Sequence, residues 1–128
     1  MSSNVTAVSP SQSLIDVKHI FEKKNFHHHI PVVFEGKLKG MISLADFLFG
    51  IKTASLDDDE EVYHNLFVKD IMREHPATCS SSASIKEVAE ILAEGNVHAI
   101  VICDNGTVKG MVSTADVIRY FLRSSNRS

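Results

Sequence analysis

The sequence is poor in the residues that stabilise small exported proteins and in the positive charge that nucleic-acid-binding proteins need. It has no tryptophan, three prolines and two cysteines. Two cysteines are too few for a disulfide framework, so we expect Cys79 and Cys103 to be buried thiols in a reducing cytoplasm. Acidic residues outnumber basic ones by 16 to 13, and the formal net charge is −3. This balance argues against sequence-independent binding of DNA or RNA.

Long apolar segments are also missing. The longest unbroken apolar run, residues 99–103, is far shorter than the roughly 20 residues that span a bilayer. The first four residues have neither the basic start nor the following apolar stretch of a signal peptide. We therefore expect a soluble, cytoplasmic protein without a membrane segment. A length of 128 residues with 44% apolar side chains is sufficient for one compact core.

The main feature that is present is an internal duplication. The segment Gly40–Asp46 recurs as Gly110–Asp116 with five of seven residues identical, and residues 25–46 share nine of 22 positions with residues 95–116. Composition alone would give about one or two such identities. Further upstream the offset between the copies changes from 70 to 71 residues, as in Ser13 and Ser84. A fixed period of this kind indicates two copies of one structural unit.

Each copy predicts a short strand, a helix, a hairpin and a closing helix. Ser13 and Ser84 precede apolar residues at helical spacing, and an acid follows each serine three positions later, which predicts capped amphipathic helices. Apolar runs on either side of Glu35-Gly36 and of Asn105-Gly106 predict two hairpins.

The closing helices are expected to differ between the copies. The first should be short because Gly50 follows soon after it begins, whereas the second should bury one apolar face. Between the copies, the acidic run 57–61 precedes Val62 and Leu66 and predicts a connecting helix rather than a cation site. The apolar residues expected to be buried by the second closing helix are Val117, Ile118, Phe121 and Leu122.

Two copies that each end in Gly-Met-apolar-Ser-x-Ala-Asp resemble the tandem cystathionine-β-synthase (CBS) domain pair, or Bateman module. The second copy also has the lead-in 68–72 and the first strand 77–79, whereas the first copy begins at the residue that matches Met72. The resemblance implies an α/β fold of two βαββα repeats related by a pseudo-twofold axis. It assigns residues 1–50 to the first repeat, 51–67 to a linker helix and 68–128 to the second repeat.

The resemblance also implies a function. Such modules bind adenosine-containing nucleotides (AMP, ADP, ATP, NAD or S-adenosylmethionine) in clefts between the repeats and signal their occupancy. The nucleotide is a regulatory ligand, and no cofactor is required. The family further implies a homodimer and a regulated partner protein that the sequence does not identify. The alternative is a ligand-free dimerisation or protein-interaction module.

Two Ser-x-x-Asp segments are the candidate ligand sites. Ser43 and Asp46, and likewise Ser113 and Asp116, follow a buried strand at the start of a helix, where free N–H groups and the helix dipole favour an anion. Each aspartate can accept two ribose hydroxyls while the serine and the helix N–H groups hold a phosphate. The alternative is a helix cap without a ligand, which has the same local pattern.

Several further residues are carried over from the family to the same sites. His28 and its repeat mate His98 match positions that meet ligand phosphates, and His29 stands where energy-sensing members often have arginine. Metal binding by the run His27–His29 is the competing interpretation, but side chains alternate along a strand, so two histidines alone would make a poor closed zinc site. The remaining candidates, on the same argument from the family, are Thr114, Thr78 and, one position out of register, Thr6.

Neither catalysis nor a monomer is expected. None of the candidate nucleophiles has a neighbouring histidine that would activate it; these are Cys79, Cys103, Ser43 and Ser113. Apolar residues of the closing helices predict a homodimer because one chain would not cover them all. These residues are Phe47, Phe49, Val117 and Phe121.

Overall fold

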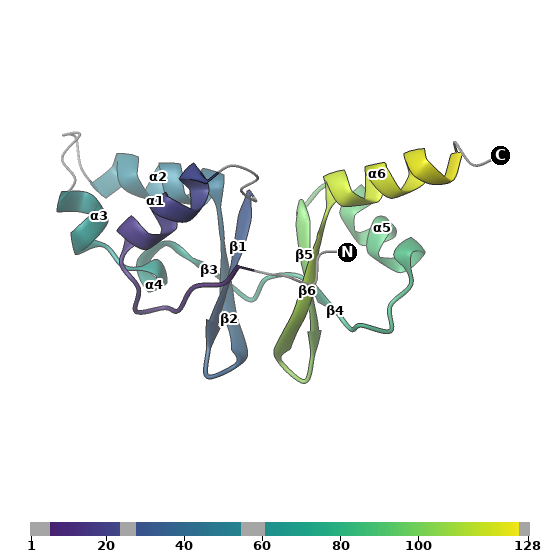
Figure 1. Cartoon of the computed structure of the whole chain (residues 1–128), viewed down its shortest axis with the longest axis horizontal. Coiled ribbons are helices and arrows are strands. Elements are labelled where there is room, and N and C mark those ends of the chain that lie inside the picture. The colour runs from purple at the N-terminus through teal and green to yellow at the C-terminus, as the bar shows by residue number, and fades with distance from the viewer. Residues whose placement is uncertain (1–5, 24–27, 55–60, 126–128) are drawn as a thin grey trace. The chain divides into compact units, whose positions relative to one another are not determined.

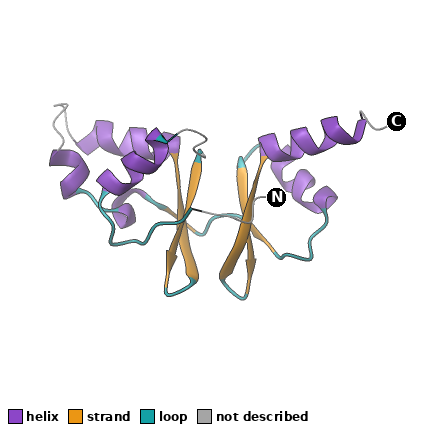
Figure 2. Ribbon diagram, viewed as in Figure 1, coloured by secondary structure: helices purple, strands orange, loops and turns teal. Residues whose placement is uncertain are grey.

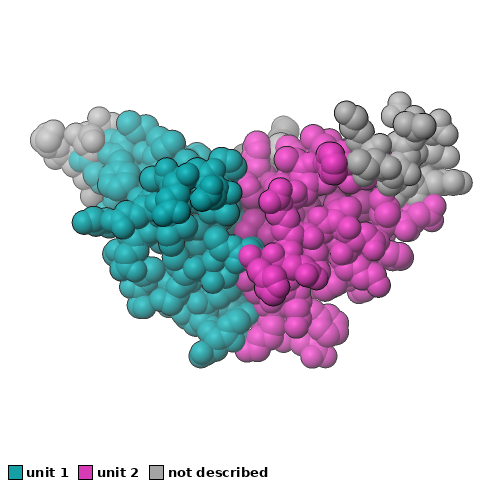
Figure 3. Space-filling view, turned by 180° about the vertical axis from the view of Figure 1, so that it is seen from behind, with its two compact units in different colours: residues 1–5, 76–128 teal, residues 6–75 magenta. Residues whose placement is uncertain are grey.

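The computed structural model describes residues 6–23, 28–54 and 61–125. The chain forms two compact units, which Figure 3 shows in different colours. We call residues 6–75 the N-terminal unit and the described residues from Pro76 onward the C-terminal unit. Residues 68–75 belong to the second copy of the sequence repeat, yet they pack with the N-terminal unit. The boundary between the packed units therefore differs from the boundary between the sequence repeats.

The N-terminal unit is an antiparallel hairpin with helices on one side of it (Figure 1). Strand β3 extends the hairpin by pairing antiparallel with β2. On the other edge, Val8 forms a parallel bridge with Val32, so the first strand of this copy is a single bridged residue. The elements in chain order are α1 (Leu14–Glu22), β1 (His29–Phe34), β2 (Lys37–Ser43), α2 (Leu44–Ala54), α3 (Glu61–Asn65), α4 (Val68–Ile71) and β3 (Arg73–Glu74).

The C-terminal unit repeats this arrangement with fewer helices (Figure 2). Strands β5 and β6 form an antiparallel hairpin, and β4 pairs parallel with β5. The predicted order of strand, helix, two strands and helix is confirmed, and the fold is a mixed α/β fold. The elements are β4 (Thr78–Cys79), α5 (Ile85–Ala93), β5 (Ala99–Asp104), β6 (Thr107–Ser113) and α6 (Thr114–Ser125).

The two hairpins have the same turn and the same irregularity. Glu35 and Gly36 have φ angles of 51° and 78°, and Asn105 and Gly106 have 54° and 81°. Two consecutive positive φ angles are the conformation of a type I′ turn, which explains why glycine is at the second position in both copies. Each hairpin also has a register shift at matching places, after Val32 and after Ile102. The duplication thus extends to backbone detail.

The two hydrophobic cores are built from equivalent positions of the repeat. The buried cluster of the C-terminal unit consists of six residues, and each has its repeat mate in the cluster of the N-terminal unit. The N-terminal core additionally contains Val8, Leu14 and Val68. The six pairs are Val17 and Val88, Phe21 and Leu92, Ile30 and Ile100, Val32 and Ile102, Ile42 and Val112, and Phe47 and Val117.

The expectation of a short closing helix in the first copy was wrong. Helix α2 runs through Gly50 to Ala54 and has 11 residues, against 12 for α6. Gly50 is buried, and a Cβ atom added to it would lie 2.7 Å from Cγ2 of Ile71 in α4. This glycine therefore allows α4 to pack closely and does not end the helix.

The caps predicted for the first helix of each copy, at Ser13 and Ser84, are confirmed in the second copy only. Ser84 Oγ accepts a hydrogen bond from the Glu87 N–H at 3.1 Å, and the Glu87 carboxylate accepts in return from the Ser84 N–H. Ser13 makes no side-chain cap: the Asp16 N–H donates to the Ser13 carbonyl at 3.1 Å, and the Asp16 carboxylate accepts from Gln12 Nε2 at 3.1 Å. The first copy thus begins its helix without the serine cap that the sequence predicts.

The closing helices bury less than the sequence predicts. Val117 is buried, but Ile118, Phe121 and Leu122 are 54%, 48% and 60% exposed. They are exposed because the contact of α6 with its own unit uses one narrow stripe of the helix, as expected when a single layer of strands supports it. Phe47 is also buried, so it and Val117 belong to the core and not to the expected dimer face.

The connecting segment is described in part. Residues 57–60 of the acidic run lie outside the described residues, and α3 begins at Glu61. Leu66 and Tyr63 pack against the core of the N-terminal unit, in agreement with an inward-facing apolar side of this segment.

Candidate functional site

In the N-terminal unit, the candidate site lies where β2 passes into α2. The Leu44 N–H donates to the His28 carbonyl at 2.7 Å, which anchors the first residue of the helix to the residue before β1. Ser43 Oγ accepts from the Asp46 N–H at 3.0 Å, and Asp46 Oδ2 accepts from the Ser43 N–H at 3.2 Å. These reciprocal bonds form a capping box, which fixes both side chains in place.

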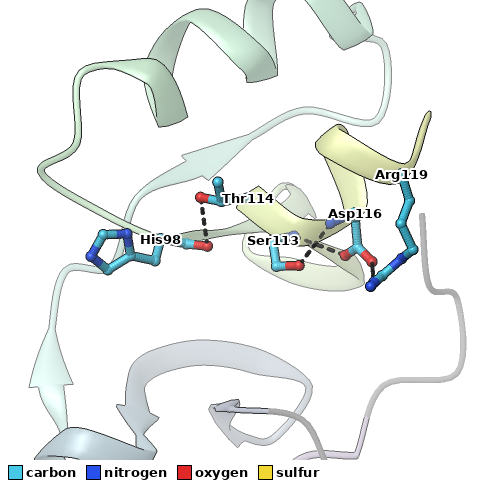
Figure 4. Close-up of polar contacts among 5 residues, drawn as sticks. All are labelled: His98, Ser113, Thr114, Asp116 and Arg119. Atoms are coloured by element: carbon cyan, nitrogen blue, oxygen red, sulfur yellow. Dashed lines mark hydrogen bonds and ion pairs between the residues drawn. The ribbon is translucent and has the colours of Figure 1, made fainter. Parts of the chain in front are cut away.

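The C-terminal unit has the same junction between β6 and α6 (Figure 4). The Asp116 N–H donates to Ser113 Oγ at 3.1 Å, and the Ser113 N–H donates to Asp116 Oδ2 at 2.9 Å. Thr114 donates to the His98 carbonyl twice, from its N–H at 3.0 Å and from its hydroxyl at 3.3 Å. The capping geometry predicted for both Ser-x-x-Asp segments is therefore present in both copies.

An arginine completes each site, and sequence reasoning missed both arginines. Arg73 Nε donates to Asp46 Oδ1 at 3.0 Å, and Arg119 Nη2 donates to Asp116 Oδ1 at 2.7 Å. Arg119 lies three residues after Asp116, so helical spacing is a signal that could have found it. Arg73 is 27 residues after Asp46, on β3, and no local pattern connects the two.

Both aspartates are held in the charged form. Partial burial raises the pKa of Asp46, but hydrogen bonds from Arg73 and Ser43 outweigh it, so the pKa lies below its ordinary value. Burial likewise raises the pKa of Asp116, and the bonds from Ser113 and Arg119 reverse this effect. Each site therefore presents a fixed negative charge next to an arginine at a helix N-terminus.

These contacts leave acceptor capacity on each carboxylate. A carboxylate has about four lone-pair positions, and the N–H of the serine and the arginine account for two of them. Asp116 is 33% exposed and Asp46 is 15% exposed, so solvent reaches both side chains. The geometry is thus a complete helix cap that can still accept two hydroxyl donors.

The predicted histidines are placed near the sites through their backbones. His28 and His98 are exposed, and their carbonyl groups face the first helical residue in each copy. In Figure 4 the His98 ring points away from Asp116, so this structure does not bring the two side chains together. His29 opens β1 and pairs with Ser43, whereas His27 lies outside the described residues. The family's phosphate-contacting role for these histidines stays a prediction.

Of the two threonines predicted near the clefts, one lies in a strand. Thr78 is exposed on β4, next to Cys79, which pairs with Ile102. The equivalent bridge between Val8 and Val32 makes Ala7 the repeat mate of Thr78. Thr6 precedes Ala7, is exposed and lies outside any strand. The register difference expected from the sequence is therefore present in the structure.

The described part of the chain offers little for metal or nucleophilic chemistry. Among residues 6–23, 28–54 and 61–125, no three His, Cys, Asp or Glu side chains are grouped so that they could hold a metal ion. Cys79 and Cys103 are free and half-buried. Burial, with Glu87 near the first and Asp104 near the second, raises the pKa of both thiols. A raised pKa leaves less of the reactive thiolate at neutral pH.

Within the same residues, every helix is too short or too polar to cross a membrane.

Comparison with known proteins identifies the family. The model of the CBS domain matches residues 1–52 and 68–123, one match for each copy of the repeat. The chain belongs to the CBS domain family and is a tandem CBS pair, or Bateman module. This agrees with the resemblance carried by the two Gly-Met-apolar-Ser-x-Ala-Asp segments.

Two relatives match nearly all of this chain but different shares of their own length. The CBS domain-containing protein YhcV of Bacillus subtilis is 38% identical over 117 residues, which cover 91% of this chain and 79% of YhcV. Protein MJ1225 of Methanocaldococcus jannaschii is 27% identical over 125 residues, which cover 92% of this chain but 44% of MJ1225. The chain thus spans less than half the length of that relative.

Solved structures share the fold. The structure of CBSX2 in complex with AMP has a TM-score of 0.78 at 23% identity, covering 95% of this chain and 90% of that one. The CBS domain pair of protein MJ0100, in complex with 5′-methylthioadenosine and S-adenosyl-L-methionine, has a TM-score of 0.77 at 23% identity, covering 94% and 93%. Mixed α/β folds with two CBS repeats are common to all three chains.

Proposed function

We propose that this CBS pair is a regulatory module that binds an adenosine-containing nucleotide and signals its occupancy. The observation that carries the proposal is the pair of fixed, partly exposed carboxylates, Asp46 and Asp116, at equivalent helix N-termini with acceptor positions to spare. AMP and S-adenosylmethionine, the ligands of two proteins with this fold, share a ribose with neighbouring hydroxyl groups. Candidate ligands are AMP, ADP, ATP, NAD and S-adenosylmethionine.

In this proposal each residue has a defined role. Asp46 and Asp116 accept hydrogen bonds from ribose hydroxyls, because an ionised carboxylate is an acceptor-only group. Ser43 and Ser113 donate their hydroxyl hydrogens to a phosphate or another negative group, because the capping bonds use these hydroxyls only as acceptors. The remaining candidate contacts, predicted from the family, are His28, His29, His98, Thr78, Thr114 and, less directly, Thr6.

The nucleotide acts as a signal and not as a substrate. The thiols of Cys79 and Cys103 have raised pKa values, and the hydroxyls of Ser43 and Ser113 accept capping hydrogen bonds from the aspartate N–H groups. These features favour a non-enzymatic protein without a required cofactor. The signal passes to a regulated partner protein or to the oligomeric state of the chain itself.

The binding proposal is tested by thermal unfolding with each candidate ligand. A ligand that binds the native state stabilises it by RT ln(1 + [L]/Kd), about 2.7 kcal/mol at a concentration of 100 Kd. We expect a saturable rise in Tm with at least one of AMP, ATP, NAD and S-adenosylmethionine. Adenine and ribose 5-phosphate serve as controls that carry only part of the ligand. Unchanged melting with all four ligands, on protein shown to be ligand-free by mass spectrometry, contradicts the proposal.

A second candidate function is a ligand-free dimerisation or protein-interaction module. The observation in its favour is the set of large apolar side chains on α2 and α6 that are 48–69% exposed. Exposed apolar groups of this size usually mark a contact surface. These residues are Leu48, Phe49, Ile118, Tyr120, Phe121 and Leu122.

The same residues support a homodimer, which both candidate functions share. We expect light scattering at micromolar concentration to give the mass of a dimer, and Phe49→Glu with Phe121→Glu to give that of a monomer. The exposed charge change Lys86→Glu, on α5, is the matched control and should leave the dimer intact. A monomeric wild-type protein at all accessible concentrations contradicts the homodimer.

A further inference from the structure

The arginines that bind the two aspartates lie on different kinds of element. Asp116 is held by Arg119 of its own helix, one turn later along α6. Asp46 is held by Arg73, which lies 27 residues later on β3. At the position equivalent to Arg119, the first copy has Phe49, so a local arginine is absent from α2 at this place. The repeat is therefore symmetric in its caps and asymmetric in its ion pairs.

Strand β3 packs closely against β2 at Arg73. Gly40 of β2 pairs with Glu74, and Met41 pairs with Arg73. A Cβ atom at Gly40 would lie 2.6 Å from the Arg73 carbonyl oxygen and 3.0 Å from Sδ of Met72. The two-residue strand β3 is thus held to β2 by backbone pairing and to α2 by the ion pair between Arg73 and Asp46.

The chain passes from one compact unit to the other directly after β3. His75 is the last residue of the N-terminal unit and has a φ of 57°, and Pro76 follows. A positive φ is uncommon for residues other than glycine, and a following proline disfavours it further because it restricts the preceding residue to extended conformations. The Ala77 carbonyl then accepts from the Val101 N–H at 3.0 Å, and β4 begins at Thr78. Three residues, 75–77, thus separate β3 from β4, and one of them is strained.

We infer that Arg73 is a positioning residue that ties the Asp46 carboxylate to the connection between the two units. A ligand bound at the first junction acts on residues 73–77 through Arg73, whereas at the second junction Arg119 ties Asp116 to its own helix, α6. The first repeat is then the one whose occupancy is transmitted. For the effect of a ligand this inference rests on the proposed function, but the link between Asp46 and β3 is a property of the protein without ligand.

The chemistry of the guanidinium sets the direction of the effect. Arg73 uses Nε for Asp46, its side chain is 77% exposed, and a guanidinium has four further N–H donors. A phosphate held at Ser43 and the start of α2 adds an anion beside this group. Two anionic partners restrain Arg73 more than one, so a bound nucleotide should make opening of β3 rarer.

The first arm of the test uses the protein without ligand. Amide hydrogen exchange at Arg73 and Glu74, followed by NMR, should become about threefold to tenfold faster in Asp46→Asn and in Arg73→Gln, and the double variant should equal the faster single one. Arg73→Gln leaves the capping box intact, so loss of folding does not explain its effect. The matched control Arg119→Gln should leave these amides unchanged. Wild-type exchange in Arg73→Gln, or equal acceleration in Arg119→Gln, overturns the inference.

The second arm adds AMP at saturation. Exchange at the same amides should slow in the wild type and in Arg119→Gln, but not in Arg73→Gln, in which AMP binding is confirmed separately by calorimetry. Equal slowing in Arg73→Gln refutes transmission through this arginine. If AMP does not bind the wild type, the proposed role of AMP fails, and the first arm still decides whether Asp46 and Arg73 control β3.

Discussion

Replacement of Asp116 by asparagine separates a ligand site from a simple helix cap. Asp116 accepts from Ser113 and Arg119 and has acceptor positions left on a side chain that is 33% exposed, against 15% for Asp46. Asparagine keeps the size but removes the charge and turns one oxygen into a donor. Losing charge-assisted hydrogen bonds to two ribose hydroxyls should cost about 1.5 to 3 kcal/mol, roughly a 10- to 150-fold rise in Kd.

The same replacement should have little effect on stability. Asp116 is the N3 residue of the capping box, and the amide oxygen of asparagine can still accept the hydrogen bond from the Ser113 N–H. The ion pair with Arg119 is partly exposed and contributes at most about 1 kcal/mol. We therefore expect Asp116→Asn to lower the free energy of unfolding by no more than about 1 kcal/mol, while ligand affinity falls much further.

Calorimetric titration of AMP, ATP, NAD and S-adenosylmethionine measures the affinity directly, and urea unfolding measures the stability. Asp46→Asn should weaken binding in the same way but less, because Asp46 is the more buried of the two and Leu44 stands where the second copy has Thr114. Asp104→Asn is the matched control, since Asp104 also accepts from a serine, Ser81, and lies outside both junctions. Full affinity in the Asp46→Asn, Asp116→Asn double variant refutes the site assignment and favours the interaction module.

Three further predictions concern packing, pH and metals. Gly40→Ala should destabilise the protein by about 1 to 3 kcal/mol in urea unfolding because the new Cβ meets the Arg73 carbonyl oxygen. Gly36→Asn has open space but a φ of 78° that strains a side chain, and it should cost less because asparagine tolerates the left-handed region better than most residues. Equal destabilisation by both variants contradicts this packing argument. Because folding lowers the pKa values of Asp46 and Asp116, their contribution to stability should be complete at neutral pH and be lost as the pH falls below about 4. Urea unfolding at a series of pH values measures this loss. An equal loss in the Asp46→Asn, Asp116→Asn double variant would contradict the prediction. Chelators should leave the Tm and nucleotide binding unchanged, since the described residues hold no group of three potential metal ligands; stoichiometric zinc that raises the Tm would show the opposite.

Local patterns in the sequence were sufficient for most elements and for the capped junctions. The turns at Glu35-Gly36 and Asn105-Gly106 need two positive φ angles, and both residue pairs have them. Ser43 with Asp46, and its repeat mate, form the predicted capping boxes because a serine and an acid three residues apart meet within one helical turn. Interactions of such short range depend on neighbours in the chain and are readable without the fold.

The exceptions occur where a distant segment competes for the same group. Gly50 predicts the end of a helix, but the close approach of Ile71 makes it a packing residue within α2. Ser13 is spaced to form a cap with Asp16, but it lies in an antiparallel bridge with Phe67, from a distant part of the chain, and makes no side-chain cap. Propensity is a weak preference, and a tertiary contact of ordinary strength is enough to reverse it.

By itself, therefore, the sequence determined that there are two copies of one βαββα unit and where the two carboxylates stand at helix starts. Which apolar residues of the closing helices join the core was decided by the tertiary structure, because Val117 is buried while Ile118, Phe121 and Leu122 are exposed. Only the tertiary structure decided which arginine holds each carboxylate and to which unit residues 68–75 belong. Arg73 reaches Asp46 because β3 pairs with β2, and strand pairing between residues far apart depends on the packing of the whole unit. The asymmetry between the two sites arises from that pairing and has no counterpart in the repeated motif.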